Sequence, residues 1–353
     1  MKIEKIAKSG FEEILVCEDQ ASGLHAIIAV HNTRLGPALG GIRMHPYATT
    51  ADALRDVTLL AQAMTYKSAA SDLKLGGGKA VILGDPAADK SPERLYAMGR
   101  FINEFKGRYI AAKDLGITTE DLIAVAKETI YMTGLPETMG GSGDPSPWTA
   151  EGIFAGIRAC FQFKLKQLNL AGVTVAIQGI GHVGLALARR LHSEGVKLIV
   201  SDTNPDLLKE VAEKLDAKAV PPDEIYDMPC EVFSPCAMGG IINDNTIKRL
   251  QCSIIAGGAN NQLADMEKHD QLLRDQGILY APDYIINAGG VINIYVKDIL
   301  KEEDAMPWIR KISGHLLDVF ERSAQSGKGV NFEADKLTQA RLERASIRRD
   351  SDS

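Results

Sequence analysis

Two lysines twelve residues apart, Lys67 and Lys79, are candidates for a chemical role because of their amine groups and their neighbours in the sequence. Lys79 follows three consecutive glycines and leads into an apolar segment that is typical of a strand. Glycine lets a backbone pass close to a ligand, and burial beside apolar residues disfavours a charged amine, so Lys79 could act as a base near neutral pH. The same pattern also fits a glycine-rich turn that precedes a strand and carries an exposed lysine.

A second chemical pattern is the glycine series Gly179, Gly181 and Gly184, which matches G-x-G-x-x-G. An apolar strand pattern precedes it, a helical pattern follows, and Asp202 ends the next strand 23 residues after Gly179. This context predicts a dinucleotide site in which helix N–H groups bind the pyrophosphate and Asp202 accepts hydrogen bonds from the ribose hydroxyls. No arginine occurs in residues 203–205, which favours NAD over NADP. The alternative is a glycine turn in an unrelated α/β sheet.

The elements around the lysines predict a mixed α/β region. Strand patterns at residues 13–17 and 24–30 flank a Ser22-Gly23 turn and indicate an antiparallel pair. Further strands are expected at 80–83 and 109–112. Helices are expected at 50–64 with Thr49 or Thr50 as N-cap, up to about 105 with Ser91 as N-cap, and after Thr118, which begins a capping box.

The later part of the chain predicts a doubly wound parallel sheet. A polar, small-residue stretch at 134–149 marks the boundary, with Ser146 as N-cap and Pro147 as the first residue of a long helix. Strand patterns at 173–178, 197–201, 231–234, 253–257 and 278–281 alternate with helices, and the chain is helical from about residue 291. We therefore expect a first domain at 1–135 with a C-terminal helix at about 333–353, and an NAD domain at 136–332, with the active-site cleft between them.

Composition limits the remaining possibilities. With 353 residues, 45% hydrophobic and 24% charged, the chain is long enough for two globular domains. A net charge of -6 argues against general binding to nucleic acid or to a membrane surface. Five scattered cysteines without C-x-x-C suggest neither a disulfide framework nor a metal site. No apolar run has membrane-spanning length and the N-terminus has no signal-like apolar region, so a cytoplasmic location is expected.

Several segments in collinear order resemble one family. They are Leu39-Gly-Gly-Ile-Arg-Met44, Met64-Thr-Tyr-Lys67, Gly76-Gly-Gly-Lys-Ala-Val81, Ala111-Ala-Lys-Asp-Leu-Gly116, Gly143-Asp-Pro-Ser-Pro-Trp-Thr-Ala150, Gly257-Gly-Ala-Asn-Asn-Gln262 and Asn287-Ala-Gly-Gly-Val-Ile-Asn293. Together they resemble the amino acid dehydrogenases of the glutamate/leucine/phenylalanine/valine group, and most of all its leucine-type members. The resemblance covers nearly the whole chain.

The resemblance implies reversible oxidative deamination, in which an L-amino acid, NAD and water give a 2-oxo acid, ammonium and NADH. Matching positions make Lys79 the base that activates water and Asp114 the group that exchanges protons with the amine. Lys67 would bind the substrate carboxylate, near the backbone of Gly40 and Gly41. The side-chain pocket would be lined by Leu39, Met64, Ala112 and Val291. The cofactor would be held by Gly179, Gly181, His182, Val183, Gly184, Asp202, Thr149, Cys236, Ala237, Asn260 and Asn287.

The apolar pocket positions favour leucine, isoleucine or valine over glutamate, which would need a cationic partner. A phenylalanine- or tryptophan-preferring member of the same family stays an alternative, because apolar pockets discriminate weakly between substrates of similar size. Two other classes are a non-catalytic NAD-binding sensor and a two-domain dehydrogenase of a folate- or shikimate-like substrate. A sensor would not need Lys67, Lys79 and Asp114 together, which argues against the first class. The Gly40-Gly41 and Asn260-Asn261 segments disfavour the second class. The resemblance also implies a homo-oligomer, of a size that the sequence leaves open.

Overall fold

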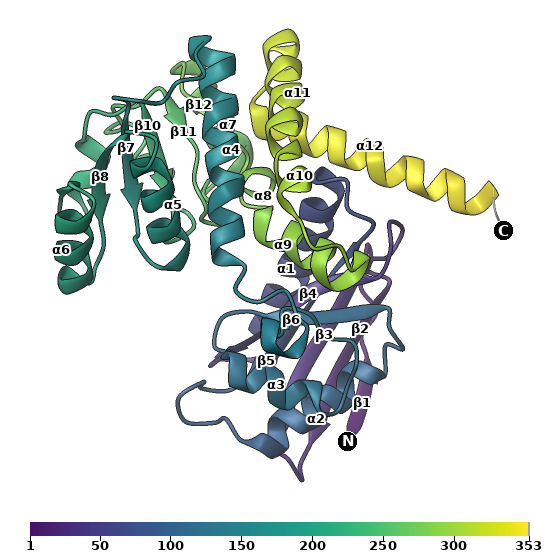
Figure 1. Cartoon of the computed structure of the whole chain (residues 1–353). Helices are drawn as coiled ribbons and strands as arrows, with labels where there is room; N and C mark the ends of the chain where they lie inside the picture. Colours follow the sequence, from purple (N-terminus) through teal and green to yellow (C-terminus); the bar gives the residue numbers. More distant parts are fainter. Residues whose placement is uncertain (352–353) are drawn as a thin grey trace. The chain divides into compact units, whose positions relative to one another are not determined.

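The computed structural model describes the backbone of residues 1–351 and the side chains of residues 1–345. The chain divides into two compact units, labelled by element in Figure 1. The first contains Met1–Asp144, Lys297–Lys301 and Thr338–Ser353, and the second contains Pro145–Val296 and Glu302–Leu337. The first unit thus extends beyond the expected boundary at 135 and includes a short segment at 297–301 that the sequence did not indicate. No helix in residues 1–351 is both long and apolar enough to cross a membrane.

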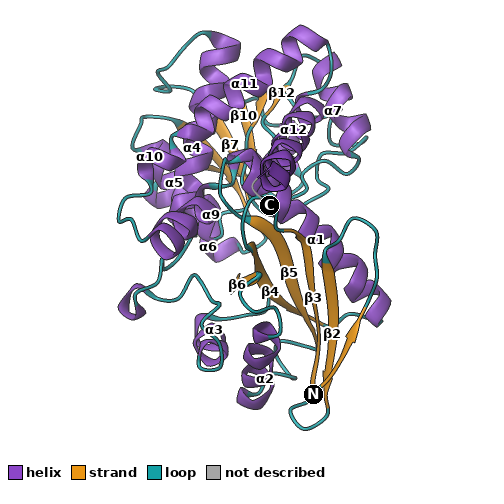
Figure 2. Cartoon of the chain, turned by 90° about the vertical axis from the view of Figure 1, so that its right-hand side faces the viewer, coloured by secondary structure: helices purple, strands orange, loops and turns teal. Residues whose placement is uncertain are grey.

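The first unit is built on a six-stranded mixed sheet of order β1-β2-β3-β5-β4-β6. Strands β1 to β3 and β5 pair antiparallel, whereas β4 pairs parallel with β5 and β6. Figure 2 shows β5 between β3 and β4. The strands are β1 (Lys2–Lys5), β2 (Glu13–Asp19), β3 (Leu24–Asn32), β4 (Ala38–His45), β5 (Gly76–Leu83) and β6 (Tyr109–Lys113), and the helices are α1 (Thr50–Ala70), α2 (Pro92–Asn103), α3 (Thr119–Ala126) and the 3-10 turn η1 (Glu137–Met139).

Different helices cover the two faces of this sheet. One face packs against α2 and α3 through a core that includes Met98, Phe101 and Val125. The other face packs against α1 through Ala53, Val57 and Ala61, which recur every four residues and therefore lie on one side of the helix. The predicted N-caps Thr49, Ser91 and Thr118 all accept a backbone hydrogen bond at the start of their helices.

One prediction and one alternative interpretation for this unit are wrong. Helix α1 ends at Ala70 rather than at Met64, because Ser68, Ala69 and Ala70 are buried and their packing overrides the weak helix propensity of the preceding Thr-Tyr pair. The glycines before Lys79 are part of strand β5 rather than a turn. They have no positive φ, so their role is to allow close packing and not to bend the chain.

The second unit contains a six-stranded parallel sheet of order β12-β11-β10-β7-β8-β9. This is the doubly wound order: β8 and β9 are added on one side of β7, and β10, β11 and β12 are then added on the other side, so the strand order reverses between β7 and β10. The strands are β7 (Thr174–Gln178), β8 (Lys197–Ser201), β9 (Lys218–Ala219), β10 (Val232–Pro235), β11 (Ile254–Ile255) and β12 (Leu279–Tyr280). Its core includes Phe233, Ile255 and Leu273.

The helices of this part of the chain agree with the predicted alternation and helical end. They are α4 (Ser146–Leu165), α5 (His182–His192), α6 (Pro205–Lys214), the 3-10 turn η2 (Glu224–Asp227), α7 (Met266–Asp275), α8 (Asp283–Ile286), α9 (Gly289–Ile294), the π-helical segment η3 (Tyr295–Leu300), α10 (Met306–Ile309), α11 (Lys311–Ser326) and α12 (Val330–Ser351). Two details differ. Ser146 is the first residue of α4 and Pro145 takes the N-cap position, because the helix begins one residue earlier than expected. The sequence also missed β9, whose two residues are exposed and carry no apolar pattern.

Candidate active site

Helix α1 lies directly on strand β5 because Gly77 has no side chain. A Cβ at Gly77 would lie 2.1 Å from the backbone nitrogen of Thr65 and 2.6 Å from the carbonyl oxygen of Ala61. A Cβ at Gly76 would lie 1.9 Å from the carbonyl oxygen of Asn32 in β3. The glycines therefore allow the backbone of the helix that carries Lys67 to pack directly against the backbone of the strand that carries Lys79.

The strand register places the predicted chemical residues on the face of the sheet that α1 covers. In the parallel pairs, Leu39 is opposite Gly77, and Gly41 is opposite Ala112. Because side chains alternate along a strand, residues two positions apart share a face. The set on this face comprises Leu39, Gly41 and Arg43 of β4, Gly77 and Lys79 of β5, and Ala112 of β6, with Asp114 two residues further on.

Lys79 and Asp114 form a close ion pair. The Lys79 Nζ lies 2.6 Å from Asp114 Oδ2, and the Lys79 side chain is only 8% exposed. Burial lowers the pKa of Lys79 below its ordinary value, although Asp114 acts in the opposite direction. Burial alone would raise the pKa of Asp114, but the charges of Lys79 and Arg43 outweigh it and hold the pKa below its ordinary value. The structure thus provides an amine that loses its proton more readily than a solvated lysine, beside a carboxylate that stays ionised.

A further charged residue, Arg43, contacts this pair and was not predicted. Its Nε lies 3.1 Å from Asp114 Oδ2, and its Nη1 lies 3.1 Å from Asp56 Oδ2. Tyr47 donates its hydroxyl to the same Asp56 oxygen at 2.5 Å. The available signal was the position of Arg43 two residues after Gly41 in a strand, which puts both residues on one face.

Gly40 and Gly41 stand where a side chain would collide with the site. A Cβ at Gly40 would lie 1.7 Å from the Gly78 carbonyl oxygen, and one at Gly41 would lie 2.7 Å from the Asp114 Cβ. The hydroxyl of the buried Tyr109 donates to the Gly40 carbonyl at 2.7 Å and fixes that peptide. Both glycines are therefore required for close packing of the strands beneath Asp114.

The residues predicted for the substrate side chain fall in both units. Leu39 and Ala112 are almost completely buried on the α1 face of the first sheet, and Met64 is partly buried in α1. Lys67 is partly buried in the last turn of α1. Val291 belongs to α9 of the second unit and is partly buried. The first unit thus has apolar side chains on the same sheet face as the Lys79–Asp114 pair.

In the second unit, the glycine series follows β7 and leads into α5. Gly179 has a φ of +87°, which glycine adopts without strain, and a Cβ at Gly184 would lie 2.0 Å from the Gly179 carbonyl oxygen. At Gly181, the N-cap of α5, no heavy atom of the described chain other than its neighbours lies within 4 Å of the Cβ position. The first N–H groups of α5, including those of His182 and Val183, have no intrahelical acceptor, so this open point can bind an anion.

Asp202 is held beside this loop by two backbone hydrogen bonds. Its Oδ2 accepts the N–H of Ile180 at 2.9 Å, and its Oδ1 accepts the N–H of Asn204 at 2.9 Å. A carboxylate has about four acceptor positions, so the orientation is fixed while capacity for hydroxyl groups remains. Asp202 lies directly after β8, the strand next to β7.

Residues after β10 lie next to the glycine loop at the reversal point of the sheet. The Ala237 Cβ would be 2.6 Å from a Cβ at Gly179, and the Cys236 Cβ 3.4 Å from one at Gly184. The crevice at such a reversal point is where doubly wound sheets bind ligands. The loop, Asp202, Cys236 and Ala237 are therefore brought together by the strand order.

The predicted asparagines form a second group in the same unit. Asn287 donates from Nδ2 to Asn260 Oδ1 at 2.8 Å and to the Gly258 carbonyl at 3.2 Å. The buried Oδ1 of Asn287 has no hydrogen-bond partner in the described part of the chain. An unpaired buried amide oxygen is costly, and a carboxamide such as that of nicotinamide could supply the missing donor. Thr149 donates to the Pro145 carbonyl at 3.0 Å, and its Oγ1 would lie 2.6 Å from a Cβ at Gly290.

Comparisons with known proteins agree with these features. A family model described as "Glu/Leu/Phe/Val dehydrogenase, dimerisation domain" matches residues 12–134, and a model described as "Glutamate/Leucine/Phenylalanine/Valine dehydrogenase" matches residues 199–311. The chain is 46% identical to leucine dehydrogenase of Thermoactinomyces intermedius over 97% of this chain and 94% of that protein. The chain belongs to the Glu/Leu/Phe/Val dehydrogenase family.

Other members of the Glu/Leu/Phe/Val dehydrogenase family are similar over nearly the full length. Phenylalanine dehydrogenase of Lysinibacillus sphaericus is 45% identical over 91% of this chain and 85% of that protein. The crystal structure of L-tryptophan dehydrogenase from Nostoc punctiforme is 40% identical, with a TM-score of 0.83, and covers 96% of this chain and 97% of that one. The predicted family resemblance and the two-domain α/β fold are therefore confirmed. The chain is an amino acid dehydrogenase, an oxidoreductase whose hydride acceptor is a nicotinamide cofactor.

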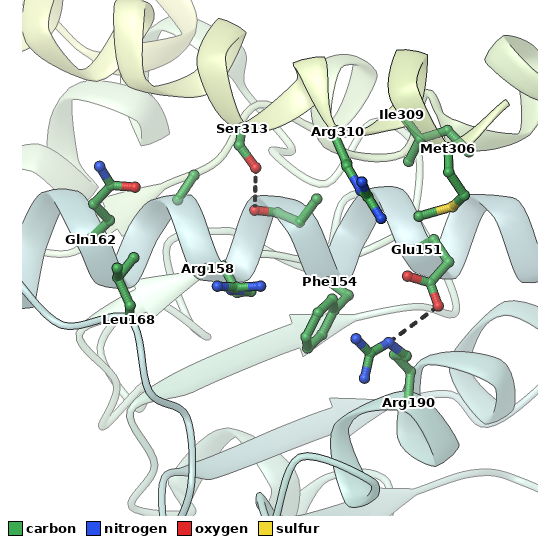
Figure 3. Close-up of a pocket in the computed structure, with 12 residues that line it drawn as sticks. Glu151, Phe154, Arg158, Gln162, Leu168, Arg190, Met306, Ile309, Arg310 and Ser313 are labelled. Carbon is green, nitrogen blue, oxygen red and sulfur yellow. Dashed lines mark hydrogen bonds and ion pairs between the residues drawn. The ribbon is translucent and has the colours of Figure 1, made fainter.

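A separate cavity of about 260 Å³ lies among α4, α5, α10 and α11 of the dehydrogenase's second unit (Figure 3). Arg190 pairs with Glu151 at 3.2 Å on one side of it, and Ser313 donates to the Ala155 carbonyl at 2.9 Å. None of its lining residues belongs to the predicted cofactor set. The cavity is thus distinct from the group of residues around the glycine loop.

Proposed function

We propose that this dehydrogenase catalyses the NAD-dependent, reversible oxidative deamination of an apolar L-amino acid, with branched aliphatic substrates preferred. The observation that carries the proposal is the buried Lys79 amine, 2.6 Å from Asp114, on a sheet face that also bears Leu39 and Ala112. A base with a lowered pKa suits water activation, and the apolar neighbours suit a hydrocarbon side chain. The 46% identity to leucine dehydrogenases supports the same assignment.

Each residue of the first unit has a chemical role in this proposal. Lys67 binds the substrate carboxylate as a fixed cation, near the Gly40-Gly41 backbone. Asp114 takes a proton from the substrate ammonium group, so that the amine lone pair is free. A bound nicotinamide cofactor would supply the acceptor for the hydride that leaves the α-carbon. Lys79 then removes a proton from water as its oxygen bonds to the imine carbon. Asp114 returns a proton to the nitrogen, the carbon–nitrogen bond breaks, and the hydroxyl proton passes to the departing ammonia, which gives ammonium and the 2-oxo acid.

The second unit supplies the cofactor site. The Gly179–Gly184 loop and the N-terminus of α5 bind the pyrophosphate, with Ala237 and Cys236 at the other wall, and Asn260, Asn287 and Thr149 hold the nicotinamide end. Asp202 accepts hydrogen bonds from the adenosine ribose, and its negative charge repels a 2′-phosphate. No arginine follows within residues 203–205 to accept that phosphate. These features support NAD rather than NADP.

A preference for aromatic substrates is the second candidate. It is favoured by the tryptophan dehydrogenase structure, which is 40% identical, and by the phenylalanine dehydrogenase relative, which is 45% identical. One methylene group in an apolar pocket changes kcat/KM by only about 10–200-fold, so small shifts at Leu39, Met64, Ala112 or Val291 decide between the two candidates.

Assembly into a homo-oligomer is part of the proposal. The model that matches residues 12–134 is described as a dimerisation domain. Strand β1 is exposed at one edge of the first sheet, and an edge strand has unpaired N–H and C=O groups that can pair with another copy. Size-exclusion chromatography with light scattering tests this part, and a monomer at micromolar concentration would contradict it.

The central test is reductive amination with ammonium and either NADH or NADPH. We expect the largest kcat/KM with 4-methyl-2-oxopentanoate or 3-methyl-2-oxobutanoate, less with phenylpyruvate and indole-3-pyruvate, and least with 2-oxoglutarate. NADH should exceed NADPH. Fastest turnover of an aromatic 2-oxo acid would select the second candidate, and no turnover with any of the five would refute the proposed activity.

A further inference from the structure

Four charged side chains and one tyrosine form a continuous series of contacts on the α1 face of the first unit. They occur in the order Lys79, Asp114, Arg43, Asp56 and Tyr47, with contacts of 2.6, 3.1, 3.1 and 2.5 Å. Lys79 and Arg43 both contact the same oxygen, Oδ2 of Asp114. Two cations and two carboxylates are present, so the group is neutral when all four are ionised.

A lysine paired with one aspartate would hold its proton firmly, because the carboxylate stabilises the ammonium ion. That is unsuitable for a base which must be deprotonated to act. Arginine is permanently charged, so Arg43 keeps Asp114 compensated whether or not Lys79 carries a proton.

We propose that Arg43 is a positioning residue that shares Asp114 Oδ2 with Lys79, so that the Lys79 amine can lose its proton before substrate binds while Asp114 stays ionised and in place to accept the proton of the substrate ammonium group. Asp56 holds the far side of the guanidinium, and Tyr47 fixes Asp56. This inference rests on the proposed role of Lys79 and adds a residue to which sequence reasoning assigned no function.

The geometry predicts opposite effects of Arg43 and Asp56 on the pKa of Lys79. The positive charge of Arg43 lowers the pKa of Lys79, and the negative charge of Asp56 raises it, against a background in which burial is the largest cause of the lowered value. Other ionisable groups on the neighbouring elements are His31 of β3, whose Nδ1 lies 2.8 Å from Thr65 Oγ1, and Lys67 of α1.

The experiment compares pH profiles of Arg43→Met, Asp56→Asn and Arg43→Lys with the wild type. The acid limb of kcat/KM for amino acid oxidation reports loss of the Lys79 proton. We expect Arg43→Met to move this limb to higher pH and Asp56→Asn to move it to lower pH. On the acid side, kcat/KM changes about tenfold for each pH unit of displacement. Arg43→Lys keeps the charge and should restore most of the limb position, while kcat stays reduced because the two-sided contact is lost.

Arg55→Met is the matched control. Arg55 is exposed, lies beside Asp56 in α1 and contacts Asp52 at 3.5 Å. Its replacement therefore removes the same positive charge as Arg43→Met but leaves the contacts of Asp114 intact. Its acid limb should match that of the wild type. Equal displacement by Arg43→Met and Arg55→Met, or displacement of Arg43→Met and Asp56→Asn in the same direction, would overturn the inference.

A readout without turnover separates this inference from the proposed function. The rate at which acetic anhydride modifies Lys79, followed peptide by peptide by mass spectrometry against pH, reports the unprotonated amine directly. The exposed Lys197 serves as the internal reference. The midpoint for Lys79 should rise in Arg43→Met and fall in Asp56→Asn even if no 2-oxo acid is turned over. Unchanged midpoints would refute the role of Arg43 alone.

Discussion

The two units place ligand-binding groups by different means. In the first unit, Lys79 of β5 and Arg43 of β4 meet at Asp114, and Asp56 of α1 contacts Arg43. In the second, the loop after β7 presents backbone N–H groups and an open Gly181, with Asp202 as the main charged side chain. The first site therefore depends on the charges and protonation of side chains, whereas the second depends on glycines whose missing side chains leave room for a ligand and for close packing. Substitutions that alter charge and substitutions that add a methyl group should separate the two.

The largest expected effect is that of Lys79→Ala. Loss of a positioned acid–base group lowers kcat by about 10²–10⁴-fold, whereas the affinity for NADH should be unchanged because no backbone group of the second unit is altered. Steady-state kinetics and NADH fluorescence titration measure the two quantities. Lys74→Ala is the control, since Lys74 is exposed five residues away and should keep wild-type kcat. Retention of kcat by Lys79→Ala would remove Lys79 from the mechanism.

The second-largest effect is expected for Gly184→Ala, which adds a methyl group to the glycine loop of the second unit. The added Cβ would lie 2.0 Å from the Gly179 carbonyl oxygen, so α5 and the loop must shift, at a cost of about 1–3 kcal/mol in the free energy of unfolding. Urea denaturation measures the stability, and NADH titration should show weaker binding. Gly314→Ala is the matched control, because Gly314 is exposed in α11 with open space around its Cβ position. It should gain about 0.5–1 kcal/mol. Equal stability of the two variants would contradict the proposed packing role.

A smaller effect is expected for Asp202→Asn. The side chain keeps its size but loses its charge and part of its acceptor capacity, so the Kd for NADH should rise about tenfold, equivalent to about 1.4 kcal/mol. Discrimination against NADPH should weaken at the same time. Isothermal titration with both cofactors tests this, with the exposed Asp206→Asn as control. An unchanged ratio of the two Kd values would place the source of selectivity elsewhere.

The smallest effect concerns carboxyl groups of the second unit away from the glycine loop. Burial raises the pKa of Asp270, which accepts the Phe332 N–H at 3.0 Å. A carboxyl whose folded-state pKa is raised loses stabilising free energy as pH rises from its unfolded pKa through its folded pKa. Asp114 behaves in the opposite way, because its pKa is lowered and its contribution is lost as pH falls. The change of the urea midpoint with rising pH, measured between about pH 3.5 and 6.5, should therefore be more positive in Asp270→Asn than in the wild type. The same slope in both would contradict the assignment.

Local patterns predicted the second unit better than the first. The glycine series, the preceding strand and Asp202 lie within 30 consecutive residues, and their geometry follows from one loop. Residues of the first site are far apart in sequence. Arg43 and Asp114, for example, are separated by 71 positions, and only the register of β4 with β5 and β6 brings them together. Arg43 was visible in the sequence as part of a family segment, but its contact with Asp114 depends on strand order, which no local pattern contains.

The errors have the same origin. The alternative of a glycine-rich turn before Lys79 rests on the frequency of glycine in turns, whereas glycine is needed there because the backbone nitrogen of Thr65 in α1 lies 2.1 Å from the Cβ position of Gly77. Helix α1 was ended too early because Ser68, Ala69 and Ala70 pack against other elements, and propensity alone does not register that packing. Contacts between distant segments decide both cases.

The contact of α1 with Gly77 has a consequence for how substrate range can change. Because backbone meets backbone there, the elements that carry Lys67 and Lys79 have no intervening side chain whose replacement could alter their spacing. Variation in size and shape is available instead at Leu39, Met64 and Ala112, which are side chains on the same face. Mutant libraries directed at these three positions, with the glycines left intact, should therefore yield new substrate preferences at unchanged chemistry, whereas libraries that include Gly77 should consist mainly of misfolded proteins.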